Sequence, residues 1–127
     1  MANTDNILSF VASEAITEFS LVSTTTDGKV KTTEAATDRR CIGVAQRACS
    51  AGDSVEVKIS GATRVIAGAT IANSTTLVMA SSNGKVETHA TSGNFSIGQI
   101  LPNINQVSSS ASDQILINFT GPVNLVP

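Results

Sequence analysis

The chain has 127 residues, of which 41% are hydrophobic and 14% are charged, and its formal net charge is −2. It is too apolar for a disordered protein, and its slight acidity excludes the basic surface that nucleic acids require. It has no Trp and no Tyr, so the aromatic rings on which single-stranded nucleic acids and sugars stack are also missing. We expect one folded domain over residues 1–127 that binds no nucleic acid.

The first 14 residues begin polar and then become apolar at Ile7, Leu8 and Phe10. We interpret residues 1–14 either as an N-terminal arm or as the first strand of the core. The segment lacks the basic region and the long apolar stretch of a signal peptide. No apolar run in the chain approaches the about 20 residues of a membrane span. The sequence therefore predicts synthesis in a cytoplasm and no membrane partner.

Residues 15–68 carry a first set of strand and turn signals. Asp-Gly between strand-like runs is typical of a hairpin with a type I′ turn, in which both central residues have positive φ. The closing run alternates, so that Val55, Val57 and Ile59 face the core on one side. In chain order the signals are Leu21-Val22, the turn Asp27-Gly28, the Ile-Gly strand Cys41–Val44, a tight turn at residues 50–53 and the alternating run Val55–Gly61.

Residues 69–121 repeat these signals. The turn Asn83-Gly84 follows Asp27-Gly28 after 56 residues (84 minus 28), and Ile97-Gly98 again forms an Ile-Gly pair. The two copies differ most in one loop, where residues 102–113 replace the tight turn at 50–53. Insertions are tolerated in loops because they leave the register of the strands intact. We therefore interpret the similarity as an internal repeat.

Between the copies, Thr63, Val65 and Ile71 predict one or two further strands. Half a domain of three or four strands cannot bury its apolar face alone, whereas two halves packed together or closed as a barrel can. We predict an all-β fold, a small β-barrel or sandwich built from two similar tandem half-modules. The half-modules would span residues 15–68 and 69–121, with a C-terminal tail at 122–127.

The residues that most often carry chemistry form no catalytic or metal-binding constellation in the sequence. On one strand Cys41 and Cys49 would lie roughly 26 Å apart, too far for a disulfide, and we expect small buried or half-buried thiols. The only histidine, His89, is predicted to be a polar residue at the end of a strand, and no serine lies in the Gly-x-Ser-x-Gly elbow that marks a nucleophile. We predict no enzymatic activity, no cofactor and no metal.

Several motifs together resemble one known family. They are Asp27-Gly28-Lys29, Ile42-Gly43-Val44-Ala45, Ala51-Gly52-Asp53 with the alternating strand that follows, Ile59-Ser60-Gly61, Asn83-Gly84-Lys85 and Ile97-Gly98. Over residues 15–121 the sequence resembles the small capsid cement, or head decoration, proteins of tailed bacteriophages. The resemblance implies a virion protein, made in the cytoplasm of a host bacterium, that binds the outside of an assembled capsid. It further implies homotrimers at junctions between capsomers, the major capsid protein as partner, and neither enzymatic activity nor a cofactor.

We predict that the capsid contact involves Asn3, Ile7, Leu8 and Phe10, on the hypothesis that the N-terminal arm adds a strand to a sheet of the capsid protein. The alternative for the same residues is an ordinary first strand of the core. A different function also remains open, namely a phage tail or fibre module that binds host surface glycans. The missing Trp and Tyr side chains disfavour it, because sugar sites usually rely on their faces.

Overall fold

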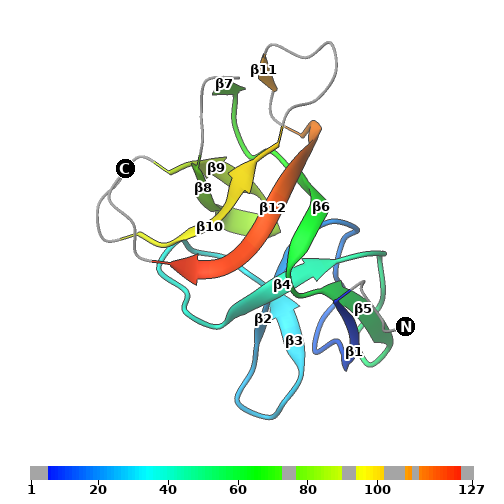
Figure 1. The fold of residues 1–127 in the computed structure, drawn as a ribbon. Helices are drawn as coiled ribbons and strands as arrows, with labels where there is room; N and C mark the ends of the chain where they lie inside the picture. The colour runs from blue at the N-terminus through cyan, green and yellow to red at the C-terminus, as the bar shows by residue number, and fades with distance from the viewer. Residues whose placement is uncertain (1–5, 73–76, 90–93, 102–107, 110–111, 124–127) are drawn as a thin grey trace.

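The computed structural model describes residues 6–72, 77–89, 94–101, 108–109 and 112–123. Strands dominate these residues and form two five-stranded antiparallel sheets, one in the lower and one in the upper part of Figure 1. The first sheet contains β1 (Ile7–Val11), β2 (Leu21–Thr24), β3 (Val30–Thr32), β4 (Cys41–Ala45) and β5 (Ser54–Lys58). The second contains β6 (Gly61–Ile66), β8 (Leu77–Ala80), β9 (Val86–Thr88), β10 (Ser96–Ile100) and β12 (Gln114–Val123). A small pair is formed by β7 (Ile71–Ala72) and β11 (Ser108–Ser109), and a 3₁₀ turn, η1, spans Ser82–Gly84.

The two sheets have the same topology. The strand order is β1-β5-β4-β2-β3 in the first sheet and β6-β12-β10-β8-β9 in the second, so that each strand has a counterpart at the same position. This confirms the predicted all-β fold of two similar half-modules. The strands predicted between the copies are β6 and β7, and β6 pairs with β12. Strand pairing therefore divides the halves near residue 60, earlier than the expected boundary at 68, and places β1 in the first half.

The repeat extends to irregularities of the sheets. The register between β2 and β4 shifts between Val22 and Ser23, which leaves Ile42 unpaired, and the register around β10 shifts in the same way at Ile97. Each Ile is followed by a glycine that the neighbouring strand crowds. A Cβ on Gly43 would lie 2.3 Å from the Lys58 carbonyl oxygen, and one on Gly98 would lie 2.7 Å from the Asn118 carbonyl oxygen. The Ile-Gly motif of the sequence thus marks a β-bulge and a close approach of two backbones.

Each sheet also curls back on itself. A parallel bridge joins Ala12, just after β1, to Val30 on β3, and the equivalent bridge joins Ala67, just after β6, to Val86 on β9. These bridges connect the two edges of each sheet at one end. Each half-module is therefore a small, nearly closed barrel whose apolar side chains face its own interior.

The core is accordingly divided into two clusters of buried side chains. One lies wholly in the first half and contains Ala12, Ile16, Val22, Val30, Ala45, Val55 and Val57. The other lies mainly in the second half and contains Val65, Ala67, Ile71, Val78, Ala80, Val86, Ile97, Ile115, Ile117 and Phe119. Leu21, Cys41 and Val44 of the first half also belong to this second cluster. These three side chains lie on the outer face of the first sheet and join the two halves by apolar packing.

The two predicted hairpins both form, but their turns differ. In the second hairpin Asn83 (φ 61°) and Gly84 (φ 73°) both have positive φ, as the predicted type I′ turn requires. In the first hairpin only Gly28 (φ 83°) does, so the type I′ prediction was wrong for Asp27-Gly28. There the Gly28 N–H donates to the Thr25 carbonyl and the Thr25 N–H to the Lys29 carbonyl, as in a three-residue loop whose last residue is left-handed.

Candidate interaction surface

The chemistry-bearing side chains are dispersed in the parts of the chain that the structure describes. No group of three or more His, Cys, Asp and Glu side chains is placed there to hold a metal ion. Both cysteines are free, as predicted; Cys41 is buried and Cys49 half-buried. Burial raises the pKa of the Cys41 thiol to about 11, so it is protonated and unreactive near neutral pH.

His89 follows β9, at the strand end where it was predicted, but its side chain is buried rather than solvated. Its Nε2 lies 3.0 Å from the Asn94 carbonyl oxygen. Its Nδ1 is buried and has no hydrogen-bond partner among the described residues.

The exposed apolar residues point to a different kind of site. Leu8 is 51% exposed and Val11 is 40% exposed, and both lie on β1. The remaining large exposed hydrophobic residue in the described part of the chain is Val123, at 39%, which ends β12 in the other half. Of the other predicted contact residues, Ile7 and Phe10 are half-buried on β1, and Phe10 packs against the first core cluster. Asn3 lies outside the described residues.

β1 is an edge strand over most of its length, since it pairs with β5 and the order of the sheet places nothing beyond it. Only at its C-terminal end does the bridge from Ala12 to Val30 join it to β3. The hydrogen bonds that flank the β1–β5 ladder show which opposite residues are hydrogen-bonded pairs. The Ile59 N–H donates to the Asn6 carbonyl, and the Ala12 N–H donates to the Asp53 carbonyl. Because hydrogen-bonded pairs alternate along an antiparallel ladder, Leu8 and Phe10 also exchange bonds with β5.

The backbone groups of Ile7, Ser9 and Val11 consequently point away from β5. Those of Ile7 and Ser9 form a short row of N–H and C=O groups along the outer edge of the sheet, with which no strand of the described residues pairs. At the Val11 end the parallel bridge between Ala12 and Val30 already joins this edge to β3. Sequence analysis missed Val11 and this phase. The alternation of Ile7, Ser9 and Val11 was visible in the sequence. Only the pairing with a particular neighbouring strand, however, shows which backbone N–H and C=O groups are already hydrogen-bonded.

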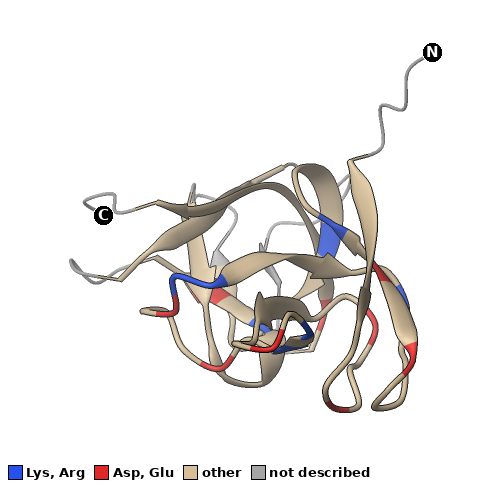
Figure 2. Ribbon diagram, turned by 90° about the horizontal axis from the view of Figure 1, so that it is seen from below, with Lys and Arg blue, Asp and Glu red and all other residues tan. Residues whose placement is uncertain are grey.

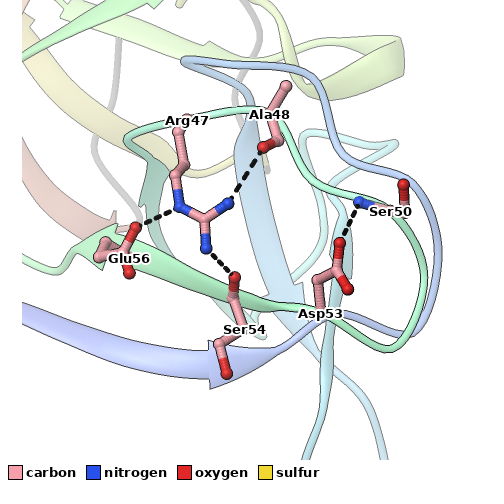
Figure 3. Close-up of polar contacts among 6 residues, drawn as sticks. All are labelled: Arg47, Ala48, Ser50, Asp53, Ser54 and Glu56. Atoms are coloured by element: carbon pink, nitrogen blue, oxygen red, sulfur yellow. Dashed lines mark hydrogen bonds and ion pairs between the residues drawn. The ribbon is translucent and has the colours of Figure 1, made fainter.

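The surface beside β1 is held in place by a network in the β4–β5 loop (Figure 3). Arg47 Nε donates to Glu56 Oε1 at 2.6 Å, and the other guanidinium nitrogens donate to the Ser54 and Ala48 carbonyls. The bond from Arg47 lowers the pKa of Glu56, and the bond to Glu56 raises the pKa of Arg47.

Asp53 completes the network, because its carboxylate accepts the Ser50 N–H at 3.2 Å within the tight turn. Ser54 and Glu56 lie opposite Val11 and Ser9 across the ladder. The β4–β5 loop is therefore ordered before binding, and the surface beside β1 would lose little conformational entropy on contact with a partner.

The remaining charges are scattered rather than gathered. Figure 2 shows acidic and basic positions interspersed over the ribbon. No helix in the described part of the chain is long and apolar enough to cross a membrane. A strand edge with exposed apolar side chains on a β framework with dispersed charge is suited to contact with another protein.

Comparison with known proteins assigns the chain to a family. A sequence model of phage cement proteins matches residues 2–111, and the chain belongs to this family. The computed structure is similar to the crystal structure of the N base of the head fibre gp8.5 of bacteriophage phi29, with a TM-score of 0.67 and 15% sequence identity. The similarity covers 92% of this chain and 96% of that chain. At this identity it supports the fold alone. A search of curated protein sequences gives no match.

Membership of the cement family confirms the resemblance seen in the sequence and gives the chain a structural role associated with the phage capsid.

Proposed function

We propose that this protein binds the outer surface of the assembled capsid at junctions between capsomers, and that it stabilises the shell by adding interface area between neighbouring subunits. Its partner in this proposal is the major capsid protein, and it acts as a homotrimer. It is made in the host bacterial cytoplasm and resides on the virion. Family membership supports the capsid as the target.

The observation that carries the proposal is the free outer edge of β1. A strand of the partner can pair with the outward N–H and C=O groups of Ile7 and Ser9, which extends the first sheet across the interface. Leu8 and Val11, on opposite faces of this strand, would then be covered on binding. Burial of exposed apolar area contributes roughly 25 cal/mol per Å², which adds to the main-chain hydrogen bonds.

The four contact residues predicted from the sequence take different roles in this proposal. Ile7 and Leu8 contact the capsid protein directly. Phe10 anchors β1 to the first core cluster, so that the edge stays in place when the partner binds. Asn3 would extend the same edge toward the N-terminus.

Two variants of one residue test strand addition. Ser9→Pro removes an N–H that points outward, so the ladder with β5 keeps its hydrogen bonds, and proline is tolerated on the solvent side of edge strands. Ser9→Ala removes the hydroxyl but keeps the N–H and is the matched control. Binding would be measured by co-sedimentation with purified shells that lack the protein, after circular dichroism has shown that both variants are folded.

We expect Ser9→Ala to bind as the unmodified chain does and Ser9→Pro to lose at least tenfold in affinity, since several consecutive main-chain bonds depend on this residue. Equal shell binding by folded Ser9→Pro would exclude strand addition at β1. Retention of the protein on a sugar column, without binding to shells, would instead support the glycan-binding alternative.

A further inference from the structure

The second half contains a strand that is equivalent to β1. β6 occupies the same place in the second sheet as β1 does in the first, at the edge and beside β12 as β1 is beside β5. A residue with positive φ stands at the start of each strand, Asn6 (φ 53°) directly before β1 and Gly61 (φ 94°) as the first residue of β6. An alanine follows each strand and bridges to the opposite edge of the sheet, Ala12 after β1 and Ala67 after β6. The two strands are therefore equivalent parts of the internal repeat.

The hydrogen bonds of β6 alternate in the same way as those of β1. The Ala67 N–H donates to the Asp113 carbonyl at 2.8 Å, at the end of the ladder with β12. Because hydrogen-bonded pairs alternate along an antiparallel ladder, Thr63 also exchanges bonds with β12. The backbone groups of Ala62 and Arg64 consequently point away from β12, toward the outer edge of the second sheet.

This outer edge is open over the same two positions as the edge of β1. Ala62 and Arg64 are exposed, and no strand of the described residues pairs with β6 on this side. Only beyond them, at Ala67, does the bridge to β9 join the edge to the rest of the sheet. The Arg64 carbonyl accepts the Thr63 hydroxyl at 3.2 Å, but a carbonyl oxygen has a second lone pair for another donor. The second half therefore also presents a short edge to which a strand can be added.

The two edges begin close together. The Ile59 N–H donates to the Asn6 carbonyl at 2.9 Å, and Gly61 follows Ile59 by two residues. Since two residues span at most about 7 Å, the starts of β1 and β6 lie within about 10 Å of each other. From there β1 runs beside β5 in the first sheet and β6 runs beside β12 in the second (Figure 1). Two partner strands that meet at one junction could reach both edges.

We infer that β6 pairs with a strand of a second, neighbouring subunit of the major capsid protein, in the way proposed for β1 with the first subunit. One chain then holds two shell subunits through two equivalent edges. The inference rests on the proposed function, which supplies the capsid protein as the partner, and it adds a second contact in each chain. A second copy of this chain is a poorer partner, because β6–β6 pairing centred on Arg64 would place two cations next to each other.

Two variants of Arg64 test this contact. Arg64→Pro removes an outward N–H and keeps the bonds to β12, and proline is tolerated on the solvent side of an edge strand. Arg64→Ala removes the charge but keeps the N–H, and it is the matched control. Ala62→Pro is a second variant of the same edge. The chain already contains Gly121-Pro122 within β12, 60 residues (121 minus 61) after Gly61-Ala62. Circular dichroism would show that each variant is folded.

Shells that lack the protein would be saturated with each variant and heated until they come apart. We expect the unmodified chain and Arg64→Ala to raise the disassembly temperature equally. Arg64→Pro and Ala62→Pro should give a smaller rise, because each chain then holds one subunit instead of two. Both should still co-sediment with shells through β1, but at least tenfold more weakly, since linked contacts strengthen one another. Combining Arg64→Pro with Ser9→Pro should abolish binding.

Photo-cross-linking on shells identifies the partner. A benzophenone side chain at Ala62 should cross-link to the capsid protein, whereas one at the exposed Thr26, on the first hairpin, should not. The inference is overturned if Ala62 cross-links to a second copy of this chain instead. It is also overturned if folded Arg64→Pro and Ala62→Pro stabilise shells as the unmodified chain does, or if Arg64→Ala loses as much as Arg64→Pro.

The same assays distinguish this failure from failure of the proposed function. If Ser9→Pro weakens shell binding while both β6 variants behave as the unmodified chain does, the second contact is excluded and the proposed function stands. An unmodified chain that does not bind shells contradicts the proposed function itself, and the inference with it.

Discussion

Substituting Gly43 by alanine is expected to destabilise the protein more than the same change at its repeat counterpart, Gly98. Neither glycine has a positive φ, so alanine is acceptable to the local backbone and the effect comes from crowding. At Gly43 the new Cβ would lie 2.3 Å from the Lys58 carbonyl oxygen and 2.5 Å from Val57 Cγ1. Because Lys58 is held in the β4–β5 ladder opposite Val44, its carbonyl cannot move away without breaking the sheet.

The distances set the expected magnitudes. Forcing extra atoms into a packed site typically costs 1–3 kcal/mol, so we expect Gly43→Ala to lower the free energy of unfolding by about 3 kcal/mol. At Gly98 the contacts are 2.7 Å to the Asn118 carbonyl oxygen and 3.1 Å to the end of the Ile117 side chain, and we expect a loss of about 1–2 kcal/mol. Gly68→Ala is the control, since its closest contact would be 3.3 Å, to side-chain atoms.

Urea unfolding followed by far-ultraviolet circular dichroism would measure these differences, since the chain has no Trp or Tyr to report by fluorescence. The Gly68→Ala variant should stay within about 0.5 kcal/mol of the unmodified chain. If Gly43→Ala were as stable as the unmodified chain, or if Gly98→Ala lost more than Gly43→Ala, the close approach of β4 to β5 inferred from the repeat would be incorrect.

Three further outcomes are expected. The pKa of the Cys41 thiol is about 11 in the folded protein, against 9.0 for a thiol without the fold around it. Because the folded state holds the proton more tightly, the free energy of unfolding should fall by about 2–3 kcal/mol between pH 9 and pH 11. The Cys41→Ala variant, measured by urea unfolding, should lack this part of the loss. Lysine at Leu8 or Val11 should weaken co-sedimentation with shells, whereas lysine at Val123, which is about as exposed as Val11, should leave it unchanged. Equal losses at all three positions would argue against β1. Replacing Arg47 by alanine should hardly move the urea midpoint, because its bond to Glu56 is exposed, but should speed amide hydrogen exchange in the β4–β5 loop; unchanged exchange would show that other contacts order this loop.

Most of the fold was predictable because the repeat consists of short motifs that each determine a local backbone geometry. The Asn-Gly turn, the alternating strands and the Ile-Gly pairs each impose a local geometry, and their recurrence indicated two equivalent halves. The boundary between the halves was not predictable in this way. The sequence of β6 predicts a strand but not the half to which it belongs. Its pairing with β12 assigns it to the second half.

The differences between equivalent positions depend on neighbours that are distant in sequence. Gly28 and Gly84 lie in almost identical sequence segments. Gly28 is nevertheless exposed, whereas Gly84 is buried against Ser20 and Thr32. Likewise His89 follows β9 as expected, but the sequence did not indicate that its side chain is buried.

The candidate interaction surface stays a prediction, and the sequence alone leaves its backbone geometry open. Apolar residues at Ile7, Leu8 and Phe10 indicated a segment with a special role, but not which backbone groups remain available. That depends on the pairing of β1 with β5 and on the phase of its hydrogen bonds. Val11 could have been included from the alternation alone, since it follows Ser9 on the same face.

An image reconstruction of purified phage particles with and without this protein tests its proposed place on the capsid most directly. If the protein binds as proposed, the reconstruction will show additional density on the outer surface at junctions between capsomers, with the β1 edge toward the shell. Density inside the shell, at the tail, or equal in both samples would contradict this proposal.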